Sequence, residues 1–111
     1  MPRVLTRYID EPKVYACANC KTHLSSDGRV MSKEFHTANG RGYLIKEVIN
    51  VTNGPSEQRT LMTGVHTCED VFCISCNVML GWEYKYAFEE KEQYKVGNFV
   101  LEEVKIMKYH W

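Results

Sequence analysis

The feature that most constrains the fold is a pair of Cys-x-x-Cys motifs separated by almost half of the chain. The motifs span Cys17 to Cys20 and Cys73 to Cys76, and the 52 residues 21–72 lie between them. Two residues between the thiols let a tight turn aim both sulfurs at one ion, and two such turns complete a tetrahedron. The spacing therefore predicts one structural metal site with these four cysteines as its ligands.

The distance between the motifs gives this metal site an architectural role. A compact zinc ribbon has only about 15–20 residues between its pairs. Closing a much longer loop costs chain entropy, which metal binding in the native fold offsets. We therefore expect the ion to join two distant turns, and a Cys→Ser change at any ligand to destabilise the whole domain. Four protein ligands leave no open coordination position, which disfavours metal-activated water chemistry.

The sequence alone leaves other uses of these thiols open. A redox Cys-x-x-Cys pair is one, although such a pair usually starts a helix and Cys73 instead ends a strand-like run. Coincidental burial of the thiols is another. His23, three residues after Cys20, is the one further candidate ligand, and with four thiols available we expect it beside the site or at the surface. Four thiolates suit iron as well as zinc, and base rate favours a single structural Zn²⁺.

Charge and composition exclude several classes of partner. The 111 residues carry 14 Lys plus Arg and 14 Asp plus Glu. Four thiolates on one Zn²⁺ would give the otherwise neutral protein a net negative charge. Neither a nucleic-acid nor an anionic-membrane partner is therefore expected. No apolar run reaches the roughly 20 residues of a membrane span, and the N-terminus lacks a signal-peptide core. Five cysteines suit a disulfide framework poorly, which indicates an intracellular protein.

Weak helical periodicity and frequent turn signals predict a mainly β chain. Residues 1–13 form a short lead-in, and residues 14–111 form a single domain. Turns are expected at Asp27-Gly28 and Asn39-Gly40, and a hairpin-like break at residues 53–56. The predicted strands are 29–33, 42–51, 58–63, 65–73, 80–86 and 99–109, with one helical turn or a loop over 87–95. Within residues 80–86, Leu80, Trp82, Tyr84 and Tyr86 fall at period two, which predicts an aromatic face.

The pattern of cysteines and glycines resembles the yippee family of small zinc proteins. After the first cysteine pair come Gly40, Leu44, Asn50 and Gly64, followed by Cys73, Cys76 and the run Gly81-Trp82-Glu83-Tyr84. These separations fit the family pattern, and the resemblance covers roughly residues 14–104. It implies the β-tent fold, two antiparallel sheets meeting near one zinc ion. That fold is shared with the thalidomide-binding domain of cereblon, the kinetochore protein Mis18 and B-type methionine sulfoxide reductases.

The resemblance also implies a non-enzymatic interaction or adaptor module. Yippee-like proteins are linked to nuclear, centrosomal and spindle roles, and some associate with a ubiquitin ligase of the CTLH or GID type. Nucleus or cytoplasm is the expected location. By analogy with cereblon, an aromatic pocket beside the second cysteine turn would accept a small cyclic group or a peptide feature. The candidate pocket residues are Trp82, Tyr84, His66, Tyr43 and Phe72. The alternative for these rings is that they simply fill the core.

A thiol-dependent reductase is the alternative function. Cys68 is its one plausible nucleophile, because the other four thiols serve the metal. His66 lies two residues away, on the same face of a strand, and could lower the thiol pKa. Against this, Glu69 and Asp70 would raise that pKa, and no resolving cysteine remains. A buried, inert Cys68 is the favoured interpretation.

Overall fold

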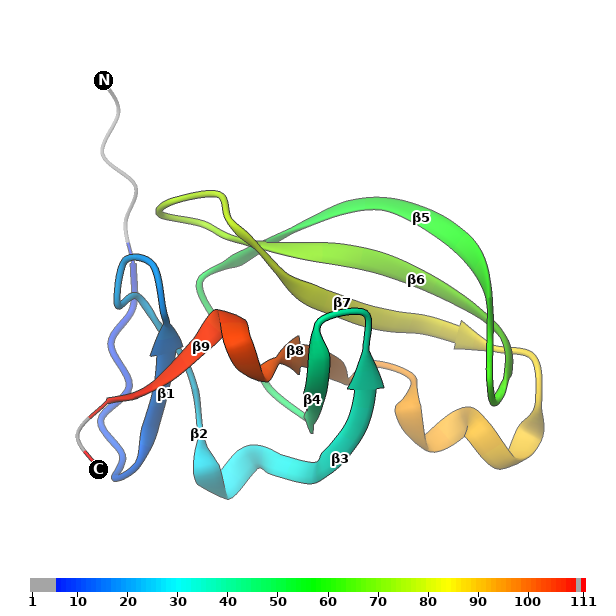
Figure 1. The fold of residues 1–111 in the computed structure, drawn as a ribbon, viewed down its shortest axis with the longest axis horizontal. Helices are drawn as coiled ribbons and strands as arrows, with labels where there is room; N and C mark the ends of the chain where they lie inside the picture. The colour runs from blue at the N-terminus through cyan, green and yellow to red at the C-terminus, as the bar shows by residue number, and fades with distance from the viewer. Residues whose placement is uncertain (1–5, 110) are drawn as a thin grey trace.

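The computed structural model describes residues 6–109 and Trp111, and over this part the chain forms two antiparallel sheets joined by short connections (Figure 1). The strands are β1 (Val14–Cys17), β2 (His23–Ser26), β3 (Val30–Thr37), β4 (Gly40–Ile45), β5 (Val51–Leu61), β6 (Gly64–Cys73), β7 (Met79–Ala87), β8 (Phe99–Glu102) and β9 (Ile106–Tyr109). Three short 3-10 segments connect them: η1 (Asp27–Arg29), η2 (Glu90–Lys95) and η3 (Glu103–Lys105). No helix in the described residues is long and apolar enough to cross a membrane.

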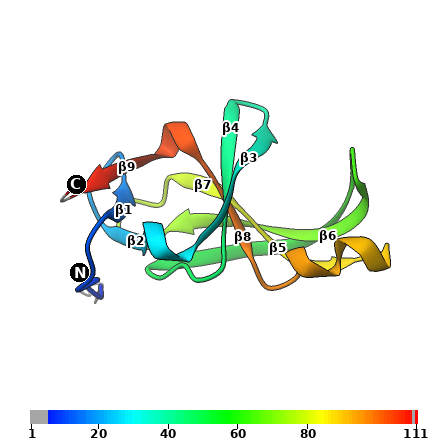
Figure 2. The ribbon, with the colours of Figure 1, turned by 90° about the horizontal axis from the view of Figure 1, so that it is seen from below.

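The sheets differ in size and lie at different ends of the molecule. The small sheet has the order β2-β1-β9, and the large sheet has the order β3-β4-β8-β7-β6-β5. Both views show the small sheet at one end, whereas the β5–β6 hairpin and η2 reach the other end (Figures 1 and 2). The predicted mainly β fold with two antiparallel sheets is confirmed.

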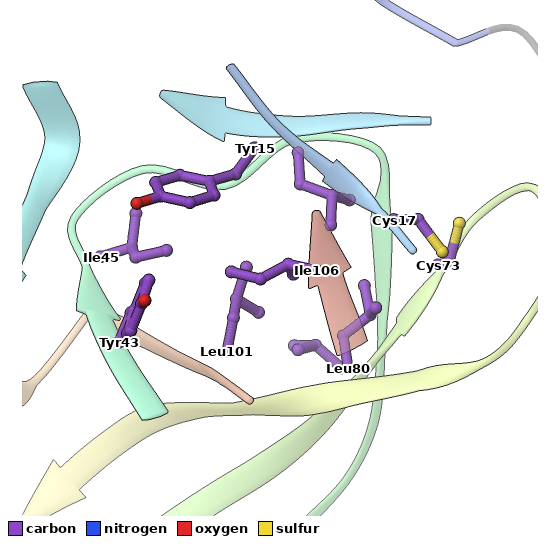
Figure 3. Close-up of a cluster of buried hydrophobic side chains, with 10 residues drawn as sticks. Tyr15, Cys17, Tyr43, Ile45, Cys73, Leu80, Leu101 and Ile106 are labelled. Carbon is purple, nitrogen blue, oxygen red and sulfur yellow. The ribbon is translucent and has the colours of Figure 1, made fainter. Parts of the chain in front are cut away.

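Two buried clusters lie on opposite faces of the large sheet. The first cluster fills the space between the sheets (Figure 3) and consists of Tyr15, Cys17, Leu24, Tyr43, Ile45, Val71, Cys73, Leu80, Leu101 and Ile106. The second cluster consists of Leu44, Cys68, Tyr84 and Val100, with Phe35, Leu61 and Trp82 packed against it. Successive residues of a strand point to opposite faces, so Ile45 belongs to the first cluster and Leu44 to the second. The large sheet therefore has one face toward the small sheet and another that builds a separate apolar surface.

The predicted hairpin break at residues 53–56 is wrong. These residues lie inside β5, where the pairing with β6 shifts between Asn53 and Ser56, and the reversal comes after Leu61. The shift places Gly54 and Pro55 in a β-bulge. Proline lacks a backbone N–H, which is tolerated at a bulge and on an edge strand, and β5 is an edge of the large sheet. The Gly54-Pro55 dipeptide thus marks an irregularity of the backbone, as predicted, but the irregularity is a bulge and not a chain reversal.

Two other sequence expectations need correction in detail. The predicted strand over 42–51 is two strands, because the chain leaves the sheet after Ile45 and re-enters it at Val51. The predicted strand over 99–109 is also two, with η3 carrying the chain from the large sheet to the small one. The helical turn expected within 87–95 is present as η2, and β6 closely matches the predicted 65–73.

The predicted aromatic face of β7 holds only for part of the strand. The register between β6 and β7 shifts twice, so that Leu80 and Lys85 are each an extra residue on β7. Each bulge reverses the alternation of faces. As a result Leu80 packs in the first cluster, Trp82 and Tyr84 belong to the second, and Tyr86 is 52% exposed.

Candidate metal centre and aromatic cavity

The two Cys-x-x-Cys turns have the same backbone geometry. Each begins with a cysteine at the end of a strand, Cys17 on β1 and Cys73 on β6. The Cys17 carbonyl accepts a hydrogen bond from the N–H of Lys21 at 2.8 Å, and the Cys73 carbonyl accepts one from the N–H of Asn77 at 2.8 Å. Lys21 and Asn77 both have positive φ, 65° and 63°. The two turns, which follow strands of different sheets, are therefore equivalent in backbone conformation.

The four cysteine sulfurs gather at the point where these turns meet. The sulfurs of Cys17, Cys20, Cys73 and Cys76 all lie within 4.8 Å of one another. Cys17 Sγ is 3.7 Å from Cys76 Sγ, and Cys20 Sγ is 3.5 Å from Cys73 Sγ. Tetrahedral bonds of about 2.3 Å to one Zn²⁺ separate sulfurs by about 3.8 Å. The donor set and its spacing therefore fit a single tetrahedral metal ion.

Neighbouring groups support this cluster from both turns. Burial raises the pKa of the Cys17 thiol to about 12, although the backbone N–H groups of Cys20 and Asn19 act in the opposite direction. Burial likewise raises the pKa of Cys73. The Thr22 hydroxyl lies 3.1 Å from Cys20 Sγ and donates to Ser75 Oγ at 2.9 Å, which links the two turns directly.

The electrostatics of the cluster call for a cation. Burial opposes ionisation of Cys76 as well, but the Asn19 side chain and the Val78 backbone lower its pKa to about 6. Four thiolates held within 4.8 Å of one another repel strongly. A divalent cation removes this repulsion, and with four protein ligands it keeps no open position for substrate. The chemistry of the set is therefore structural.

His23 lies outside the sulfur cluster. Its Nδ1 accepts a hydrogen bond from the N–H of Ile9 at 3.0 Å, and its ring packs against Tyr8 and Tyr109. The histidine thus secures the segment before β1 against the small sheet. The expectation that His23 is not a ligand agrees with this position, whereas the expected surface location does not, because the side chain is buried.

Asn50 connects the metal centre to the rest of the fold. Its φ is 60°, and its carbonyl accepts a hydrogen bond from the N–H of Ile74, inside the second cysteine turn, at 2.9 Å. Its side-chain amide donates to the carbonyls of His23 at 2.7 Å and Arg7 at 2.8 Å. An asparagine tolerates the left-handed conformation and supplies these donors. The Asn50 of the sequence pattern is therefore a structural support for the metal centre.

Only two of the five predicted pocket residues lie together in a cavity. Trp82 and Tyr84 line a cavity of about 380 Å³ on the second-cluster face of the large sheet. Its lining residues are Glu34, Phe35, His36, Leu61, Met62, Thr63, Trp82, Tyr84, Tyr94 and Lys95. They come from β3, the β5–β6 hairpin, β7 and η2. The cavity is on the opposite face of the sheet from Cys73, so the expected position beside the second cysteine turn is wrong.

The other three predicted pocket residues have separate surroundings. Tyr43 is buried in the first cluster and donates from its hydroxyl to Glu103 at 2.6 Å, and burial and Glu103 raise its pKa to about 12. His66 is buried behind Tyr84, with ring centroids 5.2 Å apart, and its Nδ1 donates to the Gly64 carbonyl at 3.0 Å. Phe72 lies over the bulge in β5. None of the three lines the cavity.

Sequence reasoning missed most of the cavity wall. Leu61 comes from a predicted strand, Tyr94 from the charged segment 87–95, and Phe35 from the stretch after the predicted strand 29–33, to which no element was assigned. Lys95 was also missed, although it is only 3% exposed and contacts three aromatic rings. A lysine directly after a tyrosine in a charged run carries no sequence signal of burial. Only the packing of η2 against β3 and β7 assembles this wall.

Cys68 is a packing residue of the second cluster. It is fully buried between Leu44, Tyr84 and Val100. Burial is the main reason why its thiol pKa is raised, and Arg59 opposes this rise only in part. A buried protonated thiol is a poor nucleophile. This agrees with the interpretation of Cys68 as inert.

Comparison with known proteins shows where this arrangement recurs. Residues 13–111 match the family described as "Yippee zinc-binding/DNA-binding /Mis18, centromere assembly". A yippee-like protein of Arabidopsis thaliana is 46% identical over 100 residues, covering 90% of this chain and 83% of the relative. A yippee-like protein of Solanum tuberosum is 46% identical over 96 residues, covering 86% and 74%. Human yippee-like protein 4 is 44% identical over 90 residues, covering 81% and 71%.

A solved structure has the same fold at much lower sequence identity. The crystal structure of the Mis18 yippee-like domain superposes with a TM-score of 0.72 at 13% identity. The match covers 91% of this chain and 98% of the Mis18 domain. At this identity the comparison concerns the fold alone, and it agrees with the two-sheet architecture described above.

Proposed function

Because the chain belongs to the Yippee-Mis18 family, we propose that it is a non-enzymatic protein-interaction module that one structural Zn²⁺ stabilises. The observation that carries this proposal is the closed set of four sulfurs, which offers a metal four ligands and no catalytic position. The family description names zinc binding, and the sulfur spacing suits that ion. The ligands are Cys17, Cys20, Cys73 and Cys76.

The interaction site we propose is the aromatic cavity on the other face of the large sheet. It combines a volume of about 380 Å³ with walls from Trp82 and Tyr84. Met62 and Tyr94 are exposed at the cavity and extend its apolar surface. Exposed apolar groups around a concave site are typical of places where a peptide feature or small ligand binds. Tyr43, His66 and Phe72 support the fold around it.

The partner we propose is a protein assembly, either a ubiquitin ligase of the CTLH or GID type or a cell-division factor. The family description supports the second, since it names centromere assembly. That description also names DNA binding, but equal numbers of basic and acidic residues give this chain no general attraction to phosphates. We place the protein in the nucleus or cytoplasm, where thiols stay reduced.

A thiol reductase is the weaker candidate. It needs an accessible, ionised Cys68, and that side chain is fully buried with a raised thiol pKa. No specific observation favours this activity.

The test is binding of the zinc-loaded protein to a reconstituted ligase of this type and to purified cell-division partners. Trp82→Ala removes a cavity wall, and Tyr86→Ala is the matched control, because Tyr86 is an exposed aromatic residue of the same strand outside the cavity. We expect wild type and Tyr86→Ala to bind alike and Trp82→Ala to bind at least about tenfold more weakly. Equal binding by all three would contradict the cavity as the site, and no binding by wild type would contradict these partners.

A further inference from the structure

The cavity contains a cation that belongs to the chain itself. The Nζ atom of Lys95 lies 5.3 Å from the ring centroid of Phe35, 5.4 Å from that of Tyr84 and 5.9 Å from that of Tyr94. Ring faces at these distances attract an ammonium group. Lys95 also lines the cavity. The position in which an aromatic cage would hold a cationic ligand is therefore already filled.

Several contacts fix this ammonium group in place. It donates to Thr63 Oγ1 at 2.8 Å and pairs with Glu92 at 3.1 Å. The backbone that follows Lys95 is tied to β7, because the Gly97 N–H donates to the Tyr84 carbonyl at 2.8 Å and the Tyr84 N–H donates to the Asn98 carbonyl at 3.0 Å. Lys95 therefore cannot withdraw from the cavity without breaking these contacts.

The ammonium group keeps capacity for one more acceptor. A lysine ammonium has three N–H donors, and Thr63 and Glu92 are its two polar partners in the described part of the chain. Of the other titratable groups that line the cavity, Glu34 and His36 are exposed. Burial raises the pKa of both Tyr84 and Tyr94, so their phenols are neutral at pH 7. The inner wall thus holds an ammonium group that is paired with Glu92 and keeps one N–H donor among apolar rings.

We propose that the cavity binds an aromatic group that carries a carboxylate and rejects the same group when it carries an ammonium. This inference rests on the proposed function of the cavity and adds the class of ligand. The ring of the ligand would pack against Trp82 and Tyr94, and its carboxylate would accept from the Lys95 ammonium. A second ammonium group would meet the first in a site of low dielectric, where like charges repel strongly.

The test compares three small probes of similar size on the zinc-loaded full chain: phenylacetate, phenylacetamide and 2-phenylethylamine. Binding is measured by NMR titration, with the Trp82 indole N–H as reporter and the Trp111 indole N–H as internal control. We expect phenylacetate to bind most tightly and the amine to bind at least about tenfold more weakly. A tripeptide ending in Phe, with a free or an amidated C-terminus, tells whether a chain terminus serves as well as a free acid.

Two variants isolate the charge. Lys95→Met should abolish the preference for the acid over the amine, whereas Glu92→Gln, which keeps the ammonium and removes its partner, should keep or increase it. The inference is overturned if the amine binds wild type as well as the acid, or if Lys95→Met leaves the order unchanged. The wild-type order decides the question by itself if Lys95→Met does not fold. If none of the probes shifts the Trp82 signal at millimolar concentration, the cavity is not a ligand site, and both the proposed function of the cavity and this inference fail. If all three probes bind equally, the inference is overturned but the cavity is still a ligand site.

Discussion

Gly81 on β7 lies directly against the backbone of Val100 on β8, so closely that a Cβ atom on Gly81 would stand 1.8 Å from the Val100 carbonyl oxygen. The contact lies between the two buried clusters, because Val100 packs in the second and its neighbour Leu101, the register partner of Gly81, packs in the first. The glycine next to Trp82 in the sequence pattern is thus required by close approach of two strands. This contact joins β7 and β8, each of which carries residues of both the first and the second cluster.

Gly81→Ala should therefore destabilise the fold strongly. The added methyl group meets backbone that cannot move aside, so we expect a loss of about 3 kcal/mol or more in the free energy of unfolding. Gly28→Ala is the matched control, since a Cβ atom there has no neighbour within 4 Å. Urea denaturation of both variants makes the comparison, and equal stability would contradict this packing.

Asn50 allows its backbone conformation and its side-chain hydrogen bonds to be tested separately. Asn50→Gly keeps the positive φ but loses the bonds to Arg7 and His23, whereas Asn50→Ala loses both. We expect Asn50→Ala to be less stable than Asn50→Gly by about 1 kcal/mol, because an alanine is strained at this φ. Thermal unfolding at constant zinc concentration measures the difference. If the two variants have the same melting temperature, the positive φ at this position does not affect stability.

The metal should contribute a large part of the stability of the domain. Elemental analysis should find one zinc per chain, and a strong chelator should lower the melting temperature markedly, because binding to the folded state alone adds its free energy to folding. Cys73→Ser should lose the zinc, whereas Cys68→Ala, outside the cluster, should retain it. Iron in place of zinc, or unchanged melting after chelation, would contradict the assignment.

Stability should fall in alkaline solution through Tyr84. Burial, opposed by the Trp82 side chain, raises the phenol pKa of Tyr84 to about 12, against about 10 in an unfolded chain. Between these values the unfolded state has released the proton and the native state has not, so stability decreases as pH rises. Wild type should lose about 2 kcal/mol more than Tyr84→Phe between about pH 10 and pH 12. Parallel pH profiles of the two proteins would show that Tyr84 ionises in the native state.

Cys68 should resist chemical modification in the native protein. Its buried thiol should react with iodoacetamide only after unfolding, because reaction requires both access and the thiolate form. Peptide mass spectrometry after brief labelling of zinc-loaded protein distinguishes Cys68 from the four clustered cysteines. Rapid labelling of Cys68, or sulfoxide reduction that Cys68→Ala abolishes, would contradict the inert role of Cys68 and support the thiol-reductase hypothesis.

The metal centre and the fold class were predictable from sequence because their signals are local or regularly spaced. Two Cys-x-x-Cys turns each need only four residues to aim two sulfurs, and period-two and turn signals indicate strands wherever they occur. Asn50 and Gly81 were also identified, as parts of a pattern whose physical reasons appear only in three dimensions. The sequence did not reveal that Gly54-Pro55 forms a bulge, because the same dipeptide suits a turn or an edge-strand bulge.

The cavity was decided by tertiary structure alone. Its walls come from β3, the β5–β6 hairpin, β7 and η2, and two bulges in β7 turn Leu80 and Tyr86 away from the face that holds Trp82 and Tyr84. A one-residue shift in register reverses which face a side chain occupies, and no local pattern records where such a shift falls. The sequence by itself therefore determined which four cysteines are placed together to hold a metal ion. The packing of distant segments decided where the aromatic site lies and placed Lys95 inside it.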